Sequence, residues 1–261
     1  MMFTPVVRAL LVTNLAFFLV DTFVFPLTNL FGLRYIFSVL FFPFQFATYM
    51  FLHADFSHIL FNMLALFNFG PMLERFWGPK KFLTFYLVCG IGAGIVYEGI
   101  NFYQLYRLQG QINLYAQNPT PDNFAAFMKN NSETGYMLSY DFIREFSENP
   151  ESNDYVSQSI RHINDLFIRK SNAPLIGASG AVFGILMAFG MMFPQSELFL
   201  FPLPIPIKAW VYVTVFGIFE LYLGVRASEH DNVAHFAHIG GMIFAYIMIV
   251  MWRKGGDYHS Y

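Results

Sequence analysis

Long apolar stretches are the feature of this sequence that most restricts its fold. A helix needs about 20 mostly apolar residues to cross a bilayer, because lipid offers no partner for backbone N–H and C=O groups. Six stretches of the sequence come close to this length. One of them, at about 205–223, qualifies if Glu220 is tolerated inside a helix bundle. We therefore predict an all-α fold, a polytopic membrane bundle of six transmembrane helices. The other five predicted spans lie at about 9–27, 57–73, 82–98, 174–193 and 233–252.

The composition also favours a membrane location. Charged residues make up 12% of the chain, about half the share that is usual in soluble domains. The net charge is −2 and no run of Lys or Arg is present, so we predict no nucleic-acid partner. A single cysteine, Cys89, excludes an internal disulfide and a multi-thiolate metal site.

Charge is concentrated in one segment. Residues 101–172 contain six of the 15 basic and eight of the 17 acidic residues. We predict three regions: 1–100, with three transmembrane helices and a partly embedded outer loop at about 28–56; a polar, partly helical insert at 101–172; and 173–261, with three more transmembrane helices.

Helices are also expected within the insert. Apolar residues recur at helical spacing from Val156 to Phe167, Pro121 opens a second helix to about Lys129, and 136–146 is a third candidate. The insert is either a cap over a substrate entrance or a helical decoration of the outer face. Its aromatic residues are expected on the membrane surface: Tyr103, Tyr106, Tyr115, Phe124 and Phe127.

Two apolar stretches can be interpreted either as transmembrane spans or as other segments. Residues 35–52 carry no charge, but Pro43 and Gln45 favour a segment that lies in the membrane interface. The stretch 9–27 lacks the small-residue cleavage site of a signal peptide, so we retain it as a span.

Basic residues on the short loops predict the orientation. If 35–52 does not cross, they gather on one side, which the positive-inside rule makes cytoplasmic. We therefore expect a multi-pass protein of the cell membrane, with both termini cytoplasmic and the insert extracellular or periplasmic. The basic residues concerned are Arg8, Arg75, Lys80, Lys81, Lys208, Arg253 and Lys254.

A serine lies among small residues at the start of the fourth predicted span, in Gly177-Ala178-Ser179-Gly180. The free N–H groups and positive dipole end of a helix N-terminus suit a developing oxyanion. The alternative is a small-residue packing face between membrane helices.

Two histidines begin the last span. Ionisable residues in a membrane helix are costly and usually functional. Gly241 and Ala245 follow His238 on a small-residue face that would let this helix approach the serine helix. Ser179 and His238 on neighbouring helices would then form the nucleophile and general base of acyl transfer. His235 is equally well explained as a polar residue near the interface.

A third polar pair lies in the second span. His58 and Asn62 are four residues apart and therefore share one helix face. Both side chains can donate to a tetrahedral oxyanion, or they can form hydrogen bonds between helices.

Together, these motifs resemble the rhomboid intramembrane serine proteases of bacterial type. HxxxN, GxSG and AHxxH followed by Gly occur in the family's order, and the resemblance covers about 1–100 and 173–261. It implies that Ser179 is the nucleophile and His238 the general base, a dyad without a carboxylate. It also implies an oxyanion site of the Ser179 N–H, His58 and Asn62.

The resemblance has further implications. Phe183 would stack on the catalytic histidine, His235 would not be catalytic, and no metal or cofactor would be needed. The substrates would be transmembrane proteins within the lipid bilayer, with weak homo-oligomerisation left open. The residues implied to pack closely around the active site are Gly177, Gly180, Phe183, Gly241 and Ala245.

Two features depart from the family pattern. Phe44-Gln45 stands where many relatives carry Trp-Arg in the first outer loop, and the insert replaces a short connection. The resemblance identifies 35–52 as part of that embedded loop.

Other classes of membrane protein fit these residues less well than a serine protease does. The His-Glu-x-x-His motif of zinc proteases is absent, and Asp21 is the only Asp within a proposed span, which excludes an aspartyl pair. Glu220 and Glu98 are interpreted as packing or interface residues. A non-catalytic rhomboid-like protein that binds and escorts transmembrane clients is the principal alternative, and a transporter is another.

Overall fold

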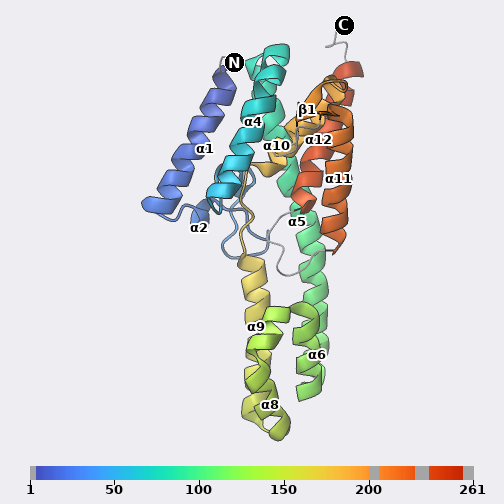
Figure 1. The fold of residues 1–261 in the computed structure, drawn as a ribbon. Coiled ribbons are helices and arrows are strands. Elements are labelled where there is room, and N and C mark those ends of the chain that lie inside the picture. The colour runs from blue at the N-terminus through green and yellow to red at the C-terminus, as the bar shows by residue number, and fades with distance from the viewer. Residues whose placement is uncertain (1–3, 200–205, 227–234, 255–261) are drawn as a thin grey trace.

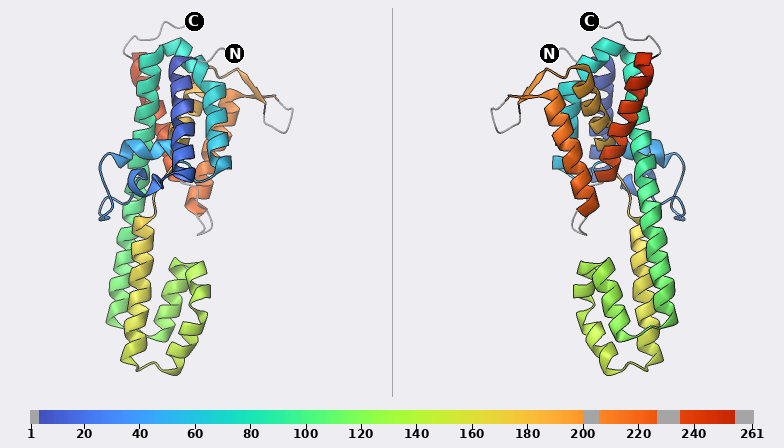
Figure 2. Two further views of the ribbon diagram at one scale, coloured as in Figure 1. Left: turned by 90° about the vertical axis from the view of Figure 1, so that its left-hand side faces the viewer. Right: turned by 90° about the vertical axis from the view of Figure 1, so that its right-hand side faces the viewer.

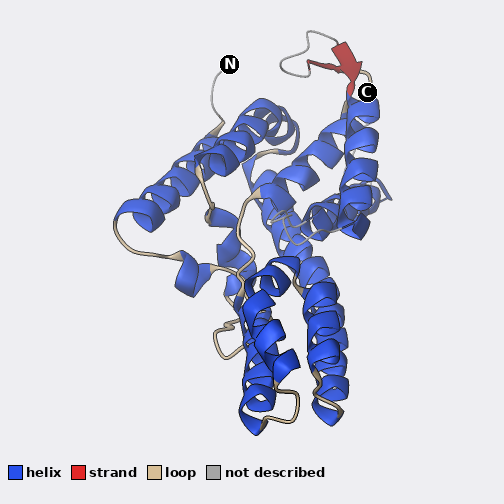
Figure 3. Ribbon diagram, turned by 60° about the horizontal axis from the view of Figure 1, so that its bottom comes forward, coloured by secondary structure: helices blue, strands red, loops and turns tan. Residues whose placement is uncertain are grey.

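The computed structural model describes residues 4–199, 206–226 and 235–254, and most of this part of the chain is helical (Figure 3). The strands among the described residues form one antiparallel hairpin of β1 (Glu197–Phe199) and β2 (Pro206–Lys208). The predicted all-α helix bundle is therefore confirmed, apart from this small hairpin.

One short helix occupies the centre of the bundle. α10 (Ser179–Met192) packs against α4 (Phe56–Trp77), α5 (Pro79–Gln117), α11 (Ala209–Arg226) and α12 (His235–Lys254). Most of its side chains are buried, as expected for a helix that is apolar on every side.

α1 (Pro5–Phe23) packs on the outside of the bundle against α4. The buried carboxylate of Glu74 accepts hydrogen bonds from the N–H groups of Val6 (2.9 Å) and Val7 (2.8 Å). These N–H groups lie in the first turn of α1, where a helix offers them no internal partner. Glu74 therefore connects the end of α4 to the start of α1.

The lengths of the helices bear on the predicted spans. α1, α4, α5, α11 and α12 are long and apolar enough to cross a membrane. α10 has 14 residues, which corresponds to about 21 Å of helix against a hydrocarbon core of about 30 Å. The expected fourth span, 174–193, thus becomes helical only at Ser179, and the expected span 205–223 becomes helical only at Ala209. A count of six spans stays a prediction.

Glycines bring α5, α10 and α12 unusually close together. A Cβ added at Gly241 would overlap the carbonyl oxygen of Gly180, so the backbones of α12 and α10 are in direct contact. A Cβ added at Gly180 would lie 2.5 Å from that of Ala93, and one at Gly240 would lie 2.8 Å from that of Val96. Close backbone approach of this kind is the usual way in which membrane helices gain van der Waals contact.

No spanning helix forms in residues 35–52, in agreement with the sequence-based interpretation. This region instead contains the short α3 (Gln45–Thr48) and a 3₁₀ turn, η1 (Tyr49–Phe51). Gln45 is fully buried. Its side-chain oxygen accepts from the Arg34 N–H, and its amide nitrogen donates to backbone carbonyls of the same loop, at Leu30 and Leu40. Gln45 therefore anchors the loop through three hydrogen bonds.

The same loop also holds the segment that leads to Ser179. Leu33 and Leu175 exchange two backbone hydrogen bonds of 3.0 and 2.7 Å. Asn172 accepts a hydrogen bond from Ser38 (2.6 Å) through its side chain and one from Arg34 through its carbonyl oxygen. The loop, which includes α2 (Thr28–Phe31), thus restrains the chain just before α10.

The insert projects from the end of the bundle opposite to the start of α1 and the end of α12 (Figures 1 and 2). α5 continues without a break through the expected boundary at residue 100, and α9 (Asn153–Asn172) packs along it. α6 (Pro121–Asn131), α7 (Glu133–Leu138) and α8 (Tyr140–Glu148) complete this part.

The expected helices of the insert are confirmed, but the candidate at 136–146 is two helices, α7 and α8, divided at Ser139. The expected place of the aromatic residues is partly wrong. Tyr103 and Tyr106 are exposed, whereas Tyr115, Phe124 and Phe127 are buried in a second hydrophobic core. The insert is long enough to have an interior of its own, and aromatic side chains gain more there than at a surface.

The close helix contact at Gly241 should contribute to the stability of the folded protein. We expect Gly241→Ala to lower the free energy of unfolding by about 1–3 kcal/mol, because the added methyl group overpacks the contact with Gly180. Gly110→Ala is the matched control, since a Cβ there meets nothing within 4 Å, and it should raise stability by up to about 1 kcal/mol. Thermal unfolding in detergent measures both, and equal stability of the two variants would contradict the packing role.

Candidate active site

Ser179 and His238 lie side by side in the interior of the bundle. Ser179 Oγ is 2.8 Å from His238 Nε2, a hydrogen-bond distance, although the two residues are 59 positions apart in the chain. His238 is 6% exposed. The contact of α10 with α12 at Gly180 and Gly241 lies next to this pair and brings the two helices within reach of each other. The pairing expected from the sequence is therefore present in the structure.

The chain turns sharply just before the serine. Gly177 has φ of +128°, a conformation that L side chains rarely adopt, and its N–H donates to the carbonyl oxygen of Tyr49 (3.0 Å). α10 begins immediately afterwards, so the Ser179 N–H belongs to the first turn, where helix N–H groups have no internal acceptor. That N–H group is thus available for an external oxygen.

His58 lies across from this turn. Asp55 caps α4 by accepting a hydrogen bond from the His58 N–H (2.9 Å), which determines where the helix begins. A Cβ added at Gly177 would lie 2.7 Å from His58 Nε2 and 3.6 Å from Ser179 Oγ. The missing side chain of Gly177 therefore leaves a small space between the serine and the imidazole.

Asn62 lies one turn further along α4, on the same face as His58. It is 6% exposed, and its side-chain nitrogen has no hydrogen-bond partner among the described residues. A buried amide without a partner is costly, and such groups often serve a ligand or a reaction intermediate. The state of Asn62 is consistent with a donor kept for a substrate oxygen.

Phe183 packs on the histidine as expected. Its ring is stacked on that of His238, with centroids 4.2 Å apart and an angle of 7° between the planes. Gly180 and Gly241 form the backbone contact described above, and Ala245 is fully buried one turn beyond Gly241.

Glu220 was not expected at this site, since the sequence favoured a packing or interface role. It projects from α11, is 7% exposed, and its Oε2 lies 2.7 Å from His238 Nδ1. The same oxygen lies 2.6 Å from His235 Nδ1. A carboxylate inside a predicted membrane span is itself a functional signal, but nothing in the sequence indicates which face of α11 meets α12.

Glu220, His235 and His238 also offer the ligand types that zinc prefers, with one ligand atom each within 4.8 Å of one another. A metal bound there would take the Nδ1 lone pair of His238. The remaining proton of the neutral ring would then lie on Nε2, facing Ser179. Metal binding and a general-base role for His238 therefore exclude each other.

His53 is a second buried histidine that the sequence did not indicate. It precedes α4, is 2% exposed, and its ring contacts that of His58 edge-on at 5.0 Å. Burial lowers the pKa of His53 to about 3, and the neighbouring His58 contributes in the same direction. His53 is therefore neutral at ordinary pH and supports His58 by contact.

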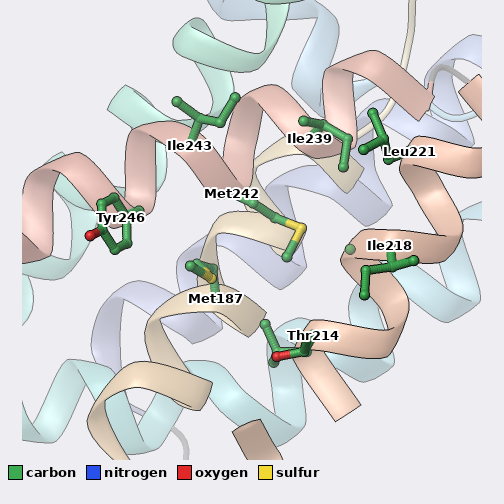
Figure 4. Close-up of a pocket in the computed structure, with 10 residues that line it drawn as sticks. Met187, Thr214, Ile218, Leu221, Ile239, Met242, Ile243 and Tyr246 are labelled. Carbon is green, nitrogen blue, oxygen red and sulfur yellow. The ribbon is translucent and has the colours of Figure 1, made fainter. Parts of the chain in front are cut away.

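A separate groove lies between α11 and α12 on the apolar surface (Figure 4). Its volume is about 400 Å³, and its lining includes Met187, Ile218, Met242 and Tyr246. None of the candidate catalytic residues lines it, so it is distinct from the Ser179–His238 site.

Comparison with known proteins agrees with this geometry. The rhomboid domain model matches residues 43–106 and 156–255, which contain every candidate site residue. The chain belongs to the rhomboid family. The unmatched central residues, 107–155, lie within the insert.

Three relatives illustrate the similarity. The chain is 29% identical over 223 residues to an uncharacterised mitochondrial rhomboid protein of Schizosaccharomyces pombe, which covers 80% of this chain and 51% of that protein. It is 26% identical to mitochondrial RHOMBOID-like protein 12 of Arabidopsis thaliana, over 80% of this chain and 46% of that protein. It is 39% identical over 56 residues to rhomboid protease AarA of Providencia stuartii, over 22% of this chain and 20% of that protein.

The relatives show the family of this chain but not its type or its cellular location. This rhomboid chain spans about half the length of the first two relatives. It is a multi-pass membrane protein of the rhomboid family, but both of those relatives are named mitochondrial. The bacterial type and the cell-membrane location stay predictions.

The buried His53 predicts a pH dependence of folding. Its pKa is about 3 in the folded rhomboid and close to 6.5 in an unfolded chain. Between these values the unfolded state binds a proton that the folded state does not, so stability should fall as the pH falls from 6.5 towards 3. We expect the loss of melting temperature between pH 7 and pH 4.5 to be smaller in His53→Phe. His162→Phe, at an exposed position of the insert, is the control that should keep the wild-type loss.

Proposed function

We propose that this chain is an intramembrane serine endopeptidase that hydrolyses peptide bonds in or next to the transmembrane helices of other proteins. The observation that carries the proposal is the 2.8 Å contact of Ser179 Oγ with His238 Nε2 inside an apolar helix bundle. Ser179 is the proposed nucleophile, His238 the general base, and the Ser179 N–H, His58 and Asn62 the oxyanion donors.

Acylation follows from these positions. Ser179 Oγ forms a bond to the scissile carbonyl carbon while its proton passes to His238 Nε2. The carbonyl π electrons move onto the oxygen, and the donors at the start of α10 and on α4 stabilise the resulting negative charge. The C–N bond then breaks, and the proton on His238 Nε2 passes to the leaving nitrogen.

Deacylation repeats the sequence with water. His238 Nε2 takes a proton from a water molecule as its oxygen attacks the acyl carbon. The bond to Ser179 Oγ breaks, and the proton returns to the serine. The stacked ring of Phe183 holds the imidazole in one plane during both proton transfers.

The shortness of α10 supports an intramembrane substrate. A helix of 14 residues is about 9 Å shorter than the hydrocarbon core. If α10 reaches the cytoplasmic surface, Ser179 lies below the outer surface of the membrane. A substrate must then bring an accessible peptide bond to that depth, which favours membrane segments that unwind easily.

The proposed orientation follows the positive-inside rule. Arg8 near the start of α1 and Arg253 near the end of α12 lie at the end of the bundle opposite to the insert (Figure 1). We place this end in the cytoplasm, or in the equivalent compartment if the membrane belongs to an organelle.

A non-catalytic protein that binds and escorts transmembrane clients is the second candidate. Such a protein would need a surface that binds transmembrane helices, but it would not need a nucleophile or a general base. The hydrogen-bond distance between Ser179 and His238, and the amide of Asn62 without a partner, favour catalysis.

Cleavage of a model transmembrane substrate in liposomes tests the proposal. We expect Ser179→Ala and His238→Ala each to reduce kcat/KM by at least about 10⁴-fold, because nucleophile and base act as a unit. Ser147→Ala is the control and should keep wild-type activity, since Ser147 is exposed in the insert and its hydroxyl donates to the Ile143 carbonyl oxygen of its own helix. Full activity in Ser179→Ala would contradict the proposal.

The oxyanion role of Asn62 has its own test. Asn62→Ala should reduce kcat on the order of 100-fold with little change in melting temperature, because it removes one donor to the intermediate. Asn14→Ala is a matched control at another buried asparagine, which donates to its own helix at Leu10. An unchanged rate in Asn62→Ala would remove Asn62 from the site while leaving the Ser179–His238 pair.

A further inference from the structure

Glu220 adds a carboxylate to a site whose family resemblance implies a dyad alone. We propose that Glu220, held in place by His235, is a positioning residue that keeps His238 in the tautomer required of a general base. This inference rests on the proposed function of Ser179 and His238. It is carried by two contacts of one oxygen atom, Glu220 Oε2, with the Nδ1 atoms of both histidines.

The tautomer follows from counting protons. An ionised carboxylate only accepts hydrogen bonds, so contacts of 2.6 and 2.7 Å require a proton on each Nδ1. A neutral His238 with its proton on Nδ1 has a lone pair on Nε2. That lone pair faces Ser179 Oγ at 2.8 Å and is ready to accept the hydroxyl proton.

The opposite tautomer would be inactive. With the proton on Nε2, His238 could not take a proton from Ser179. Without a carboxylate on the Nδ1 side, neither tautomer would be favoured by a charged partner. When Nε2 takes the serine proton, Glu220 also balances the positive charge of the imidazolium, as the carboxylate of a serine-protease triad does.

His235 makes the buried carboxylate tolerable. A charge in the low-dielectric interior is costly unless it is paired and hydrogen-bonded. The second N–H, from His235, supplies another donor to Glu220 Oε2. Its role is therefore to hold Glu220, which in turn holds His238.

The packing of α11 places Glu220 at this point. Gly217 and Gly224 lie on either side of Glu220 in the helix and face α12. A Cβ added at Gly224 would lie 3.2 Å from that of His235, and one at Gly217 would lie 3.0 Å from Met242 Cε. These glycines let α11 come near enough for the Glu220 side chain to reach both imidazoles.

Substitutions of Glu220 in the full chain test the proposal in EDTA, with Ser179→Ala as the reference for zero activity. Glu220→Gln keeps the shape, but its amide can donate to Nδ1 and so favour the inactive tautomer. We expect kcat to fall by at least about 10-fold, up to the ~10⁴-fold loss expected of tautomer reversal, with KM within about twofold of the wild type. Glu220→Asp keeps the charge and should recover part of kcat.

Two further variants complete the set. His235→Gln keeps a side-chain donor near Glu220 and should show a smaller fall in kcat than Glu220→Gln. Glu74→Gln is the control for a buried carboxylate with two N–H donors away from the dyad, and it should keep the wild-type kcat. A fall in Glu74→Gln equal to that in Glu220→Gln would assign the effect to lost folding.

Nitrogen chemical shifts of ¹⁵N-histidine in the wild-type protein provide a measurement that needs no active variant. The His238 signals, assigned by their loss in His238→Gln, should show the proton on Nδ1. A proton on Nε2, or a wild-type kcat in Glu220→Gln alongside an inactive Ser179→Ala, would overturn the proposal while leaving the serine mechanism intact. Equal activity in Ser179→Ala and the wild type would instead reject the proposed function itself.

Discussion

The backbone contact between Gly180 and Gly241 is the interaction on which the rest of the structure depends. No side chain separates α10 from α12 there, so the two helix backbones are in direct contact. Ser179 precedes one of these glycines, and His238 lies one turn before the other. Their 2.8 Å contact is a consequence of that approach. In lipid, where helices gain nothing by hiding apolar surface from water, such close packing supplies much of the association energy.

The outer loop stabilises the extended segment of the chain that leads to Ser179. α10 begins only at Ser179 because Gly177, with φ of +128°, has a backbone conformation that is not helical. The extended segment before it would be costly in lipid if its backbone groups were unpaired. Hydrogen bonds with Leu33 and Tyr49 satisfy that backbone and hold it in place. The insert continues from the same region and adds its own hydrophobic core without entering the bundle.

Much of this arrangement could be predicted because it is local in sequence. Apolar runs predicted the helix bundle, and the four-residue spacing of His58 and Asn62 predicted one face. The two small-residue motifs predicted where α10 and α12 meet. The contacts of Glu220 could not be predicted for a physical reason: its partners His235 and His238 are on another helix, and the rotation of α11 depends on packing at Gly217 and Gly224. The β1–β2 hairpin was missed because its strands have three residues each, too few for a pattern.

The sequence by itself determined that this chain crosses a membrane, that it has the rhomboid motifs, and that a few polar residues remain among apolar ones. Those properties depend on hydrophobicity and on spacing along one helix. Only the tertiary structure decided that Glu220 Oε2 meets two imidazoles, that Asn62 keeps a donor without a described partner, and that His53 is buried beside His58. Each of these depends on how helices and loops rotate against one another, which is set by the sum of many contacts rather than by any one segment.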